Sequence, residues 1–288
     1  MHSLKFELAP SYASLLLAMK HDEKYRSRIF DILWASFHAL DKLLKECPPG
    51  FVVQSLTDFQ TSINSINTYS NSLLTSVKRS GTKLIMDCGG LERLYAADQY
   101  FVEPLVFDDP VANLEAQLSL SPNIATLLDD MRNSRALEDL PMPRLEKLLK
   151  KANEDGIELM VVIHSDDLTK IEKLQGLKLL NYISYVALPD KELRYNYSIL
   201  ANLKILGKKL VIFGLDDLSY EHLSEIAKHG VILGDLSKWS TCRLEFENEG
   251  QVLLKTFKQI PSSDELEQIL YENLLKFQKI ERNVTKRL

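Results

Sequence analysis

Brief apolar runs alternate with helical patterns through the second half of the chain, from about residue 82 to 236. The runs are short and rich in Val, Ile and Leu, which is typical of strands buried on both faces. Apolar residues at helical spacing follow most of them. The alternation predicts a mainly parallel sheet whose strands are joined by crossover helices. The runs occupy residues 83–86, 105–107, 158–163, 182–188, 209–213 and 231–233.

The first 81 residues have a different pattern. Apolar residues recur every three or four positions over 23–46 and again over 56–77, which predicts two long amphipathic helices. A turn at 47–50 separates them, and Gly81 stands where a helix C-cap is expected. The short run 51–53 is open to a second interpretation, as a strand.

The C-terminal part predicts a hairpin and a final helix. Residues 242–246 and 251–257 have strand character and flank the turn-like segment 247–250. Ser262, Ser263, Asp264 and Glu265 form a capping signal, after which apolar residues fall on one helical face.

The expected fold class is therefore α/β, with a mainly parallel sheet, an N-terminal α-helical region, and a C-terminal hairpin plus helix. We expect two units, an α-helical region at 1–81 and an α/β domain at 82–288. Either a doubly wound sheet or an incomplete β/α barrel satisfies the pattern. Segment 207–235 begins with a Gly-Lys-Lys strand, continues with a helix, and ends with the sequence His-Gly-Val-Ile-Leu-Gly-Asp. This segment resembles the closing unit of many (β/α) barrels.

Charge and cysteine content limit the classes of partner and compartment. The net charge of −5 supplies no general attraction to nucleic acid or to an anionic membrane. Three widely spaced cysteines form no zinc motif and favour a reducing compartment. The apolar stretch 12–19 is too short for a membrane span and lacks a basic leader. We therefore expect a cytoplasmic protein with no membrane or nucleic-acid partner.

Acidic residues gather just after the apolar runs, where the carboxyl ends of parallel strands meet. Asp87, Asp166 and Asp235 are the candidate ligands of a divalent cation, because magnesium and manganese favour oxygen ligands. His164 is the candidate general acid or base, and Asp87 and Asp235 are its candidate catalytic partners. Gly89 and Gly90 follow the first of these strands and are the candidate phosphate-binding turn of a cofactor.

A purely structural interpretation competes with each of these roles. Expected helices follow Asp166 or Asp167, Asp190, and Asp216 or Asp217. An aspartate at such a position caps free backbone N–H groups and needs no active site. Gly89 and Gly90 also suit a plain tight turn, since no complete phosphate-binding motif surrounds them. Asp87 and Asp235 are less well explained by capping.

Two functions remain in view. The first is a non-catalytic regulatory or protein-interaction module, suggested by the missing catalytic motifs and by the two amphipathic helices. Those N-terminal helices would bind a protein partner or a second copy of the chain. The alternative is a divalent-cation-dependent hydrolase that acts on a phosphorylated small molecule at the C-terminal edge of the sheet. Magnesium or manganese is expected as a cofactor only under this alternative.

Overall fold

The protein is built around a closed barrel of eight parallel strands, which follow one another around the ring in chain order. The computed structural model describes residues 5–12, 28–61, 63–90, 109–129, 142–164, 172, 175, 178–193, 196–236, 238–247 and 252–288. The strands are β1 (Glu7–Tyr12), β2 (Phe51–Ser55), β3 (Lys83–Asp87), β4 (Ile124–Thr126), β5 (Glu158–Val162), β6 (Ile183–Pro189), β7 (Lys209–Phe213) and β8 (Val231–Leu236).

The ring closes where the first strand meets the last. Residues Glu7 to Pro10 of β1 pair with residues 233–236 of β8, and the other side of β1 pairs with β2 at Ser11 and Tyr12. The α/β class and the parallel sheet are thus confirmed. Of the two arrangements left open, a doubly wound sheet is excluded, and the barrel is complete.

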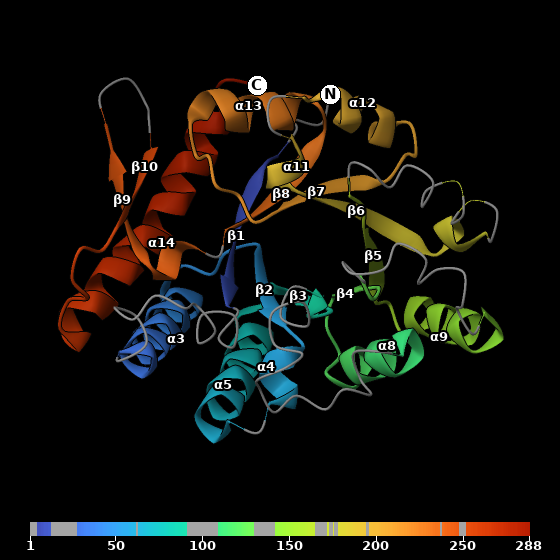
Figure 1. Ribbon diagram of the computed structural model, residues 1–288, viewed down its shortest axis with the longest axis horizontal. Coiled ribbons are helices and arrows are strands. Elements are labelled where there is room, and N and C mark those ends of the chain that lie inside the picture. Colours follow the sequence, from blue (N-terminus) through green and yellow to red (C-terminus); the bar gives the residue numbers. More distant parts are fainter. Residues whose placement is uncertain are drawn as a thin grey trace.

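Helices surround the strands (Figure 1). Helices α3 and α5 follow β1 and β2, and α5 ends at Gly81, whose φ of 77° is the left-handed conformation that glycine adopts readily. The helices are α3 (Ile29–Glu46), α4 (Thr57–Gln60), α5 (Asn64–Ser80), α8 (Pro110–Ser119), α9 (Met142–Glu154), α11 (Asp190–Leu193), α12 (Ser198–Lys204), α13 (Tyr220–Lys228) and α14 (Ser263–Thr285). None of the described helices is long and apolar enough to cross a membrane.

Several expected boundaries differ from the structure. The helix expected over 56–77 begins only at residue 64, because 51–55 form a strand and the short α4 follows it. Strands β1 and β4 were not predicted at all. The run at 105–107 lies outside the described residues. The sheet continues across the expected unit boundary near residue 81, since β2 pairs with β3 from Phe51 to Ser55.

Two apolar layers hold the barrel together. Side chains from all eight strands fill its interior, among them Ala9, Ile85, Val162 and Leu233. The alternate strand residues face outward and pack against the helices in a larger core. Alternation along each strand therefore decides which residues reach the inside of the barrel.

The expected C-terminal hairpin and helix are confirmed. Strands β9 (Cys242–Phe246) and β10 (Val252–Thr256) pair antiparallel beside α14 at the edge of the molecule (Figure 1). The buried Asn273 of α14 accepts a hydrogen bond from Leu244 N and donates to the carbonyls of Trp239 and Cys242. One amide side chain thus joins the helix to the start of the hairpin.

Candidate active site

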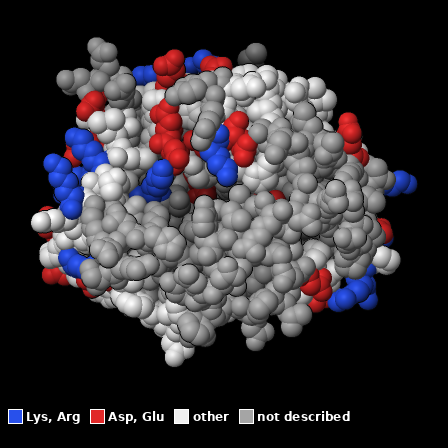
Figure 2. Space-filling view, in the orientation of Figure 1, with Lys and Arg blue, Asp and Glu red and all other residues white. Residues whose placement is uncertain are grey.

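The carboxyl ends of all eight strands open at one end of the barrel, which we call the mouth. Asp87 comes two residues after the interior Ile85, and Asp235 comes two residues after the interior Leu233. Alternation therefore directs both carboxylates into the mouth. Asp235 is buried, and Asp87 is partly buried. Figure 2 shows acidic side chains at the bottom of a hollow over the strands.

His164 lies between two carboxylates that the neighbouring strands supply. Its Nε2 is 2.9 Å from Asp129 Oδ2, and its Nδ1 is 3.4 Å from Glu192 Oε1. Asp129 follows β4, His164 follows β5, and Glu192 lies in α11 directly after β6. The three side chains are 8%, 15% and 20% exposed, in that order, so the group is shielded from solvent but still open to it.

The two contacts give the imidazole nitrogens different roles. An ionised carboxylate only accepts hydrogen bonds, so the short contact places a proton on Nε2, which donates to Asp129. In the neutral tautomer that carries this proton, Nδ1 has none and can accept one. Once it does, the imidazolium donates to Glu192 as well, and two carboxylates stabilise its charge. The arrangement suits a histidine that takes up and returns protons.

A buried amide network in α8 fixes the end of β4, and with it the position of Asp129. Gln117 donates to Thr126 O at 2.6 Å, and its Oε1 accepts from Thr126 N at 2.9 Å. Gln117 Nε2 also contacts Asn113 Oδ1 at 2.7 Å, and Asn113 in turn donates to Cys88 O. Both amide side chains are fully buried. The network joins the ends of β3 and β4 through one helix face.

The turn after β3 is packed tightly against Asp129. A Cβ atom on Gly90 would lie 2.5 Å from Asp129 O, so only glycine fits. Gly89 has a φ of 80°, and its N–H lies 3.4 Å from Asp87 Oδ2. A cofactor role for Gly89 and Gly90 stays a prediction, with the tight-turn interpretation beside it. Burial, followed by the nearby carboxylates of Asp87 and Asp129, raises the pKa of the Cys88 thiol well above its usual value, so the thiol is protonated.

A second histidine joins the loops after β6 and β7. His222 Nε2 lies 2.9 Å from Asp190 Oδ1, and its Nδ1 lies 2.9 Å from the Tyr197 hydroxyl. Asp190 Oδ2 also accepts from Asp216 N at 3.0 Å. Burial lowers the pKa of His222, but the hydrogen bond to Asp190 and the charges of Asp190 and Asp217 outweigh it, so the pKa is raised. Asp190 thus anchors a neighbouring loop rather than capping a long helix.

The predicted site residues are placed as follows. His164, Asp87 and Asp235 follow or end strands of the barrel and reach the mouth, while Asp166 lies outside the described residues. Within the part of the chain that the structure describes, no three His, Cys, Asp or Glu side chains converge in a way that could hold a metal ion. The metal and catalytic roles of these residues stay predictions.

Sequence reasoning missed the two carboxylates that contact His164. Asp129 follows β4, a strand of only three residues that was not predicted. A signal was present, because Asp129 and Asp130 form an acidic pair directly after the segment 124–128, like the aspartates that follow the other apolar runs. Glu192 stands two residues after Asp190, inside an expected helix, where no pattern in the sequence marks it as a site residue.

Comparison with known proteins gives the fold but no family. No family model and no curated protein matches the chain. A solved structure from Coccidioides immitis, assigned as a fructose-1,6-biphosphate aldolase, matches over 99% of this chain and 94% of its own, at 10% identity and a TM-score of 0.54. The YdjI aldolase from Escherichia coli K12 matches over 99% and 90%, at 10% identity and a TM-score of 0.50. A tryptophan synthase from M. tuberculosis matches over 96% and 94%, at 10% identity and a TM-score of 0.50.

These likenesses correct the functional expectation. The solved proteins that share the fold are enzymes, so the expectation of a non-catalytic regulatory or protein-interaction module is wrong. The alternative, a divalent-cation-dependent hydrolase of a phosphorylated small molecule, is overturned by the same finding. At 10% identity the likeness establishes a fold and carries no substrate with it.

Proposed function

We propose that the chain is an enzyme that transfers protons on a small, neutral hydroxy-carbonyl compound bound in the mouth of the barrel, as a lyase or isomerase does. The observation that carries the proposal is His164, whose ring bridges Asp129 and Glu192 at the ends of adjacent strands. The mouth of such a barrel is where loops from several strands surround a substrate.

The chemistry of the described side chains supports proton transfer over covalent catalysis. The Cys88 thiol is buried and protonated, which makes it a poor nucleophile. His164 has a nitrogen that can accept a proton and two carboxylates that stabilise the resulting cation. General acid–base catalysis of this kind contributes about a hundredfold to ten-thousandfold in rate. An enolate is common to keto–enol isomerisation and aldol-type cleavage: the first forms it by removal of the C–H proton beside the carbonyl, and the second forms it by breaking a C–C bond as the hydroxyl proton is removed, after which the enolate carbon takes up a proton.

The charge of the mouth supports a neutral substrate. Asp87, Asp129, Glu192 and Asp235 all lie at the carboxyl ends of strands or just after them. Within the part of the mouth that the structure describes, these carboxylates disfavour phosphate and carboxylate groups, and they offer many hydrogen-bond acceptors to hydroxyl groups. Two of the solved structures that share the fold are named aldolases, which is compatible with a hydroxy-carbonyl substrate.

The test is hydrogen exchange at carbon. The protein is incubated in deuterated buffer with dihydroxyacetone, glyceraldehyde and erythrulose, and with hydroxypyruvate as the anionic contrast, and loss of substrate C–H signals is followed by proton NMR. We expect exchange with at least one neutral compound and a loss of about a hundredfold or more in His164→Gln. His229→Gln is the matched control, because that ring lies at the end of α13, where it contacts Glu225 of its own helix and stacks on Tyr197. Equal rates in native protein and His164→Gln would overturn the role of His164, and exchange with none of the neutral compounds would overturn the substrate class.

A further inference from the structure

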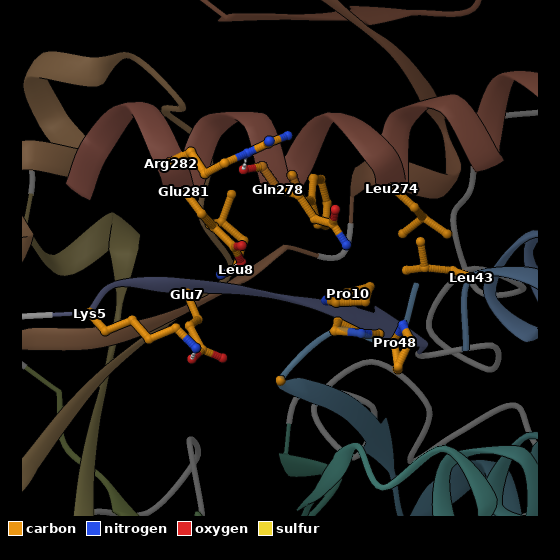
Figure 3. A pocket seen from close by; sticks show the side chains of 13 residues that line it. Lys5, Glu7, Leu8, Pro10, Leu43, Pro48, Leu274, Gln278, Glu281 and Arg282 are labelled. Carbon is orange, nitrogen blue, oxygen red and sulfur yellow. Dashed lines mark hydrogen bonds and ion pairs between the residues drawn. The ribbon is translucent and has the colours of Figure 1, made fainter. Parts of the chain in front are cut away.

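A pocket of about 310 Å³ opens at the opposite end of the barrel from the mouth (Figure 3). That volume is at the lower end of the range for small-ligand sites, about 300–1,000 Å³. The start of β1, the turn before β2 and helix α14 enclose the pocket, so its walls come from both ends of the sequence.

The pocket lies where the barrel is open between two strands. From Glu7 to Pro10, β1 pairs with β8, but it meets β2 only at Ser11 and Tyr12. The Leu8 N–H donates to Glu281 Oε1 at 2.7 Å, so a side chain from α14 occupies the position of a ladder partner. Pro10 has no N–H to pair. The gap between these strands forms one wall of the pocket.

Four charged side chains line the pocket, and three of them are engaged. Lys5 forms an ion pair with Glu7, and the Arg282 guanidinium donates to Gln278 O on its own helix. Figure 3 shows Arg282 extending along α14, whereas Glu281 points from the helix toward β1. Among the described residues, Glu281 has no ion-pair partner, and the Leu8 N–H is its one hydrogen-bond donor.

Burial, with a smaller effect of the Glu7 charge, raises the pKa of Glu281 to about 7, against the lowering effects of the Leu8 N–H, Lys5 and Arg282. The carboxyl group is therefore about half ionised at neutral pH. A ligand that brings a positive charge to this carboxyl group favours its ionised form and gains the full interaction. Beyond Glu281, the pocket continues between apolar side chains, namely Leu43, Leu274, Phe277, Pro10, Pro48 and Pro49.

We propose that this pocket is a second ligand site, which binds a primary amine carrying a short apolar chain. The ammonium group donates to the Glu281 carboxylate, and the chain packs between Leu43, Leu274 and Phe277. The site is separate from the mouth and does not depend on the reaction proposed there.

The binding test uses n-butylammonium chloride on the full chain in amine-free buffer, followed by NMR titration at pH 6 and pH 8. Affinity is expected to rise about tenfold between these pH values, because the ionised fraction of a group with a pKa of about 7 rises from about a tenth to about nine tenths. n-Butanol and butyrate are the contrast ligands. If butanol binds as well as butylammonium, or butyrate binds better, the proposed ligand class is wrong.

Glu281→Gln is the matching variant, since glutamine retains an oxygen for the Leu8 N–H but carries no charge. It is expected to weaken butylammonium binding about tenfold at pH 8 and to abolish the pH dependence. Glu272→Gln, an exposed position on the same helix, should leave binding unchanged.

A second readout requires no variant. Calorimetry of the native protein in two buffers of different ionisation heat should show release of about half a proton per ligand at pH 7. Unchanged binding in Glu281→Gln, or no proton release, would overturn the proposal.

Discussion

Replacing Glu281 with glutamine is expected to make the protein more stable at pH 7.5 and to matter much less at pH 5. The pKa of Glu281 is about 7 in the folded protein, against an ordinary value of 4.5. Because the folded pKa is raised, this carboxyl group favours the folded state when it is protonated. That favourable contribution is complete below pH 4.5 and is lost as the pH rises to about 7.

The magnitude follows from the difference of about 2.5 pKa units at about 1.4 kcal/mol each. Ionisation of the buried group costs about 1 kcal/mol at pH 5 and about 3 kcal/mol at pH 7.5. Glutamine cannot ionise, so the variant avoids this loss, whereas any cost of its extra amide group is the same at every pH. The free energy of unfolding of Glu281→Gln minus that of the native protein should therefore rise by about 2 kcal/mol between pH 5 and pH 7.5.

Urea unfolding followed by circular dichroism at four pH values between 5 and 8 measures this difference. The buffers must contain no amine, since an amine bound beside Glu281 would lower its pKa and mask the effect. Glu272→Gln, at an exposed position, controls for the loss of one charge from α14. If the free energy of unfolding of Glu281→Gln minus that of the native protein stays constant or falls as the pH rises, the reasoning is refuted.

Three further predictions concern the mouth. Gln117→Ala leaves the Thr126 backbone groups and Asn113 Oδ1 without their partner. The free energy of unfolding, measured in urea, should therefore fall by about 2–4 kcal/mol. A decrease of less than about 1 kcal/mol would contradict the network. Gly90→Ala forces the turn away from Asp129 O and should lower the free energy of unfolding by about 1–3 kcal/mol. It should also shift the NMR signals of the His164 ring nitrogens. Unchanged signals would show that the turn accommodates a methyl group. Asp190→Asn removes the main partner that raises the pKa of His222. The stability that a raised histidine pKa contributes is complete below pH 6.5 and is lost as the pH rises through the folded pKa. The variant should therefore lose more stability at pH 5.5 than at pH 8.5, and equal losses would contradict the pairing.

The strands that could be predicted are those with long enough apolar runs. Strands β3, β5, β6, β7 and β8 each contain a run of apolar residues that includes Val, Ile or Leu, and all five lie where the sequence indicates. β1 escaped notice because Pro10 stands within it, and proline in a run normally argues against a strand. β4 has only three residues, Ile124 to Thr126, which is too short for a periodic signal.

The candidate site was predictable only in part, because strand ends are visible in a sequence and neighbouring loops are not. His164 and the two aspartates Asp87 and Asp235 stand at predicted strand ends. Asp129 is 35 residues away from His164, and Glu192 is 28 residues away. Their contact depends on the order of strands around the ring and on how far each loop reaches inward. Periodicity contains neither piece of information.

The aspartates that precede helices show the same limit. Asp109 does cap α8, accepting from Val111 N at 2.8 Å. At α13, however, Ser219 is the cap, and Asp217 bonds to the Ser219 N–H one step earlier. Asp190 has a different role again, as the partner of His222. A capping pattern therefore indicates a helix start correctly without saying which side chain does the capping.

The pairing of β1 with β8 has a consequence for synthesis on the ribosome. Residues Glu7 to Pro10 are made more than two hundred positions before their partners on one side, residues 233–236. During elongation that edge of the nascent sheet stays unsatisfied and open to pairing with another chain. We therefore expect chains halted before residue 231 to aggregate or to engage chaperones, and the emergence of β8 to be the event that permits the ring to close.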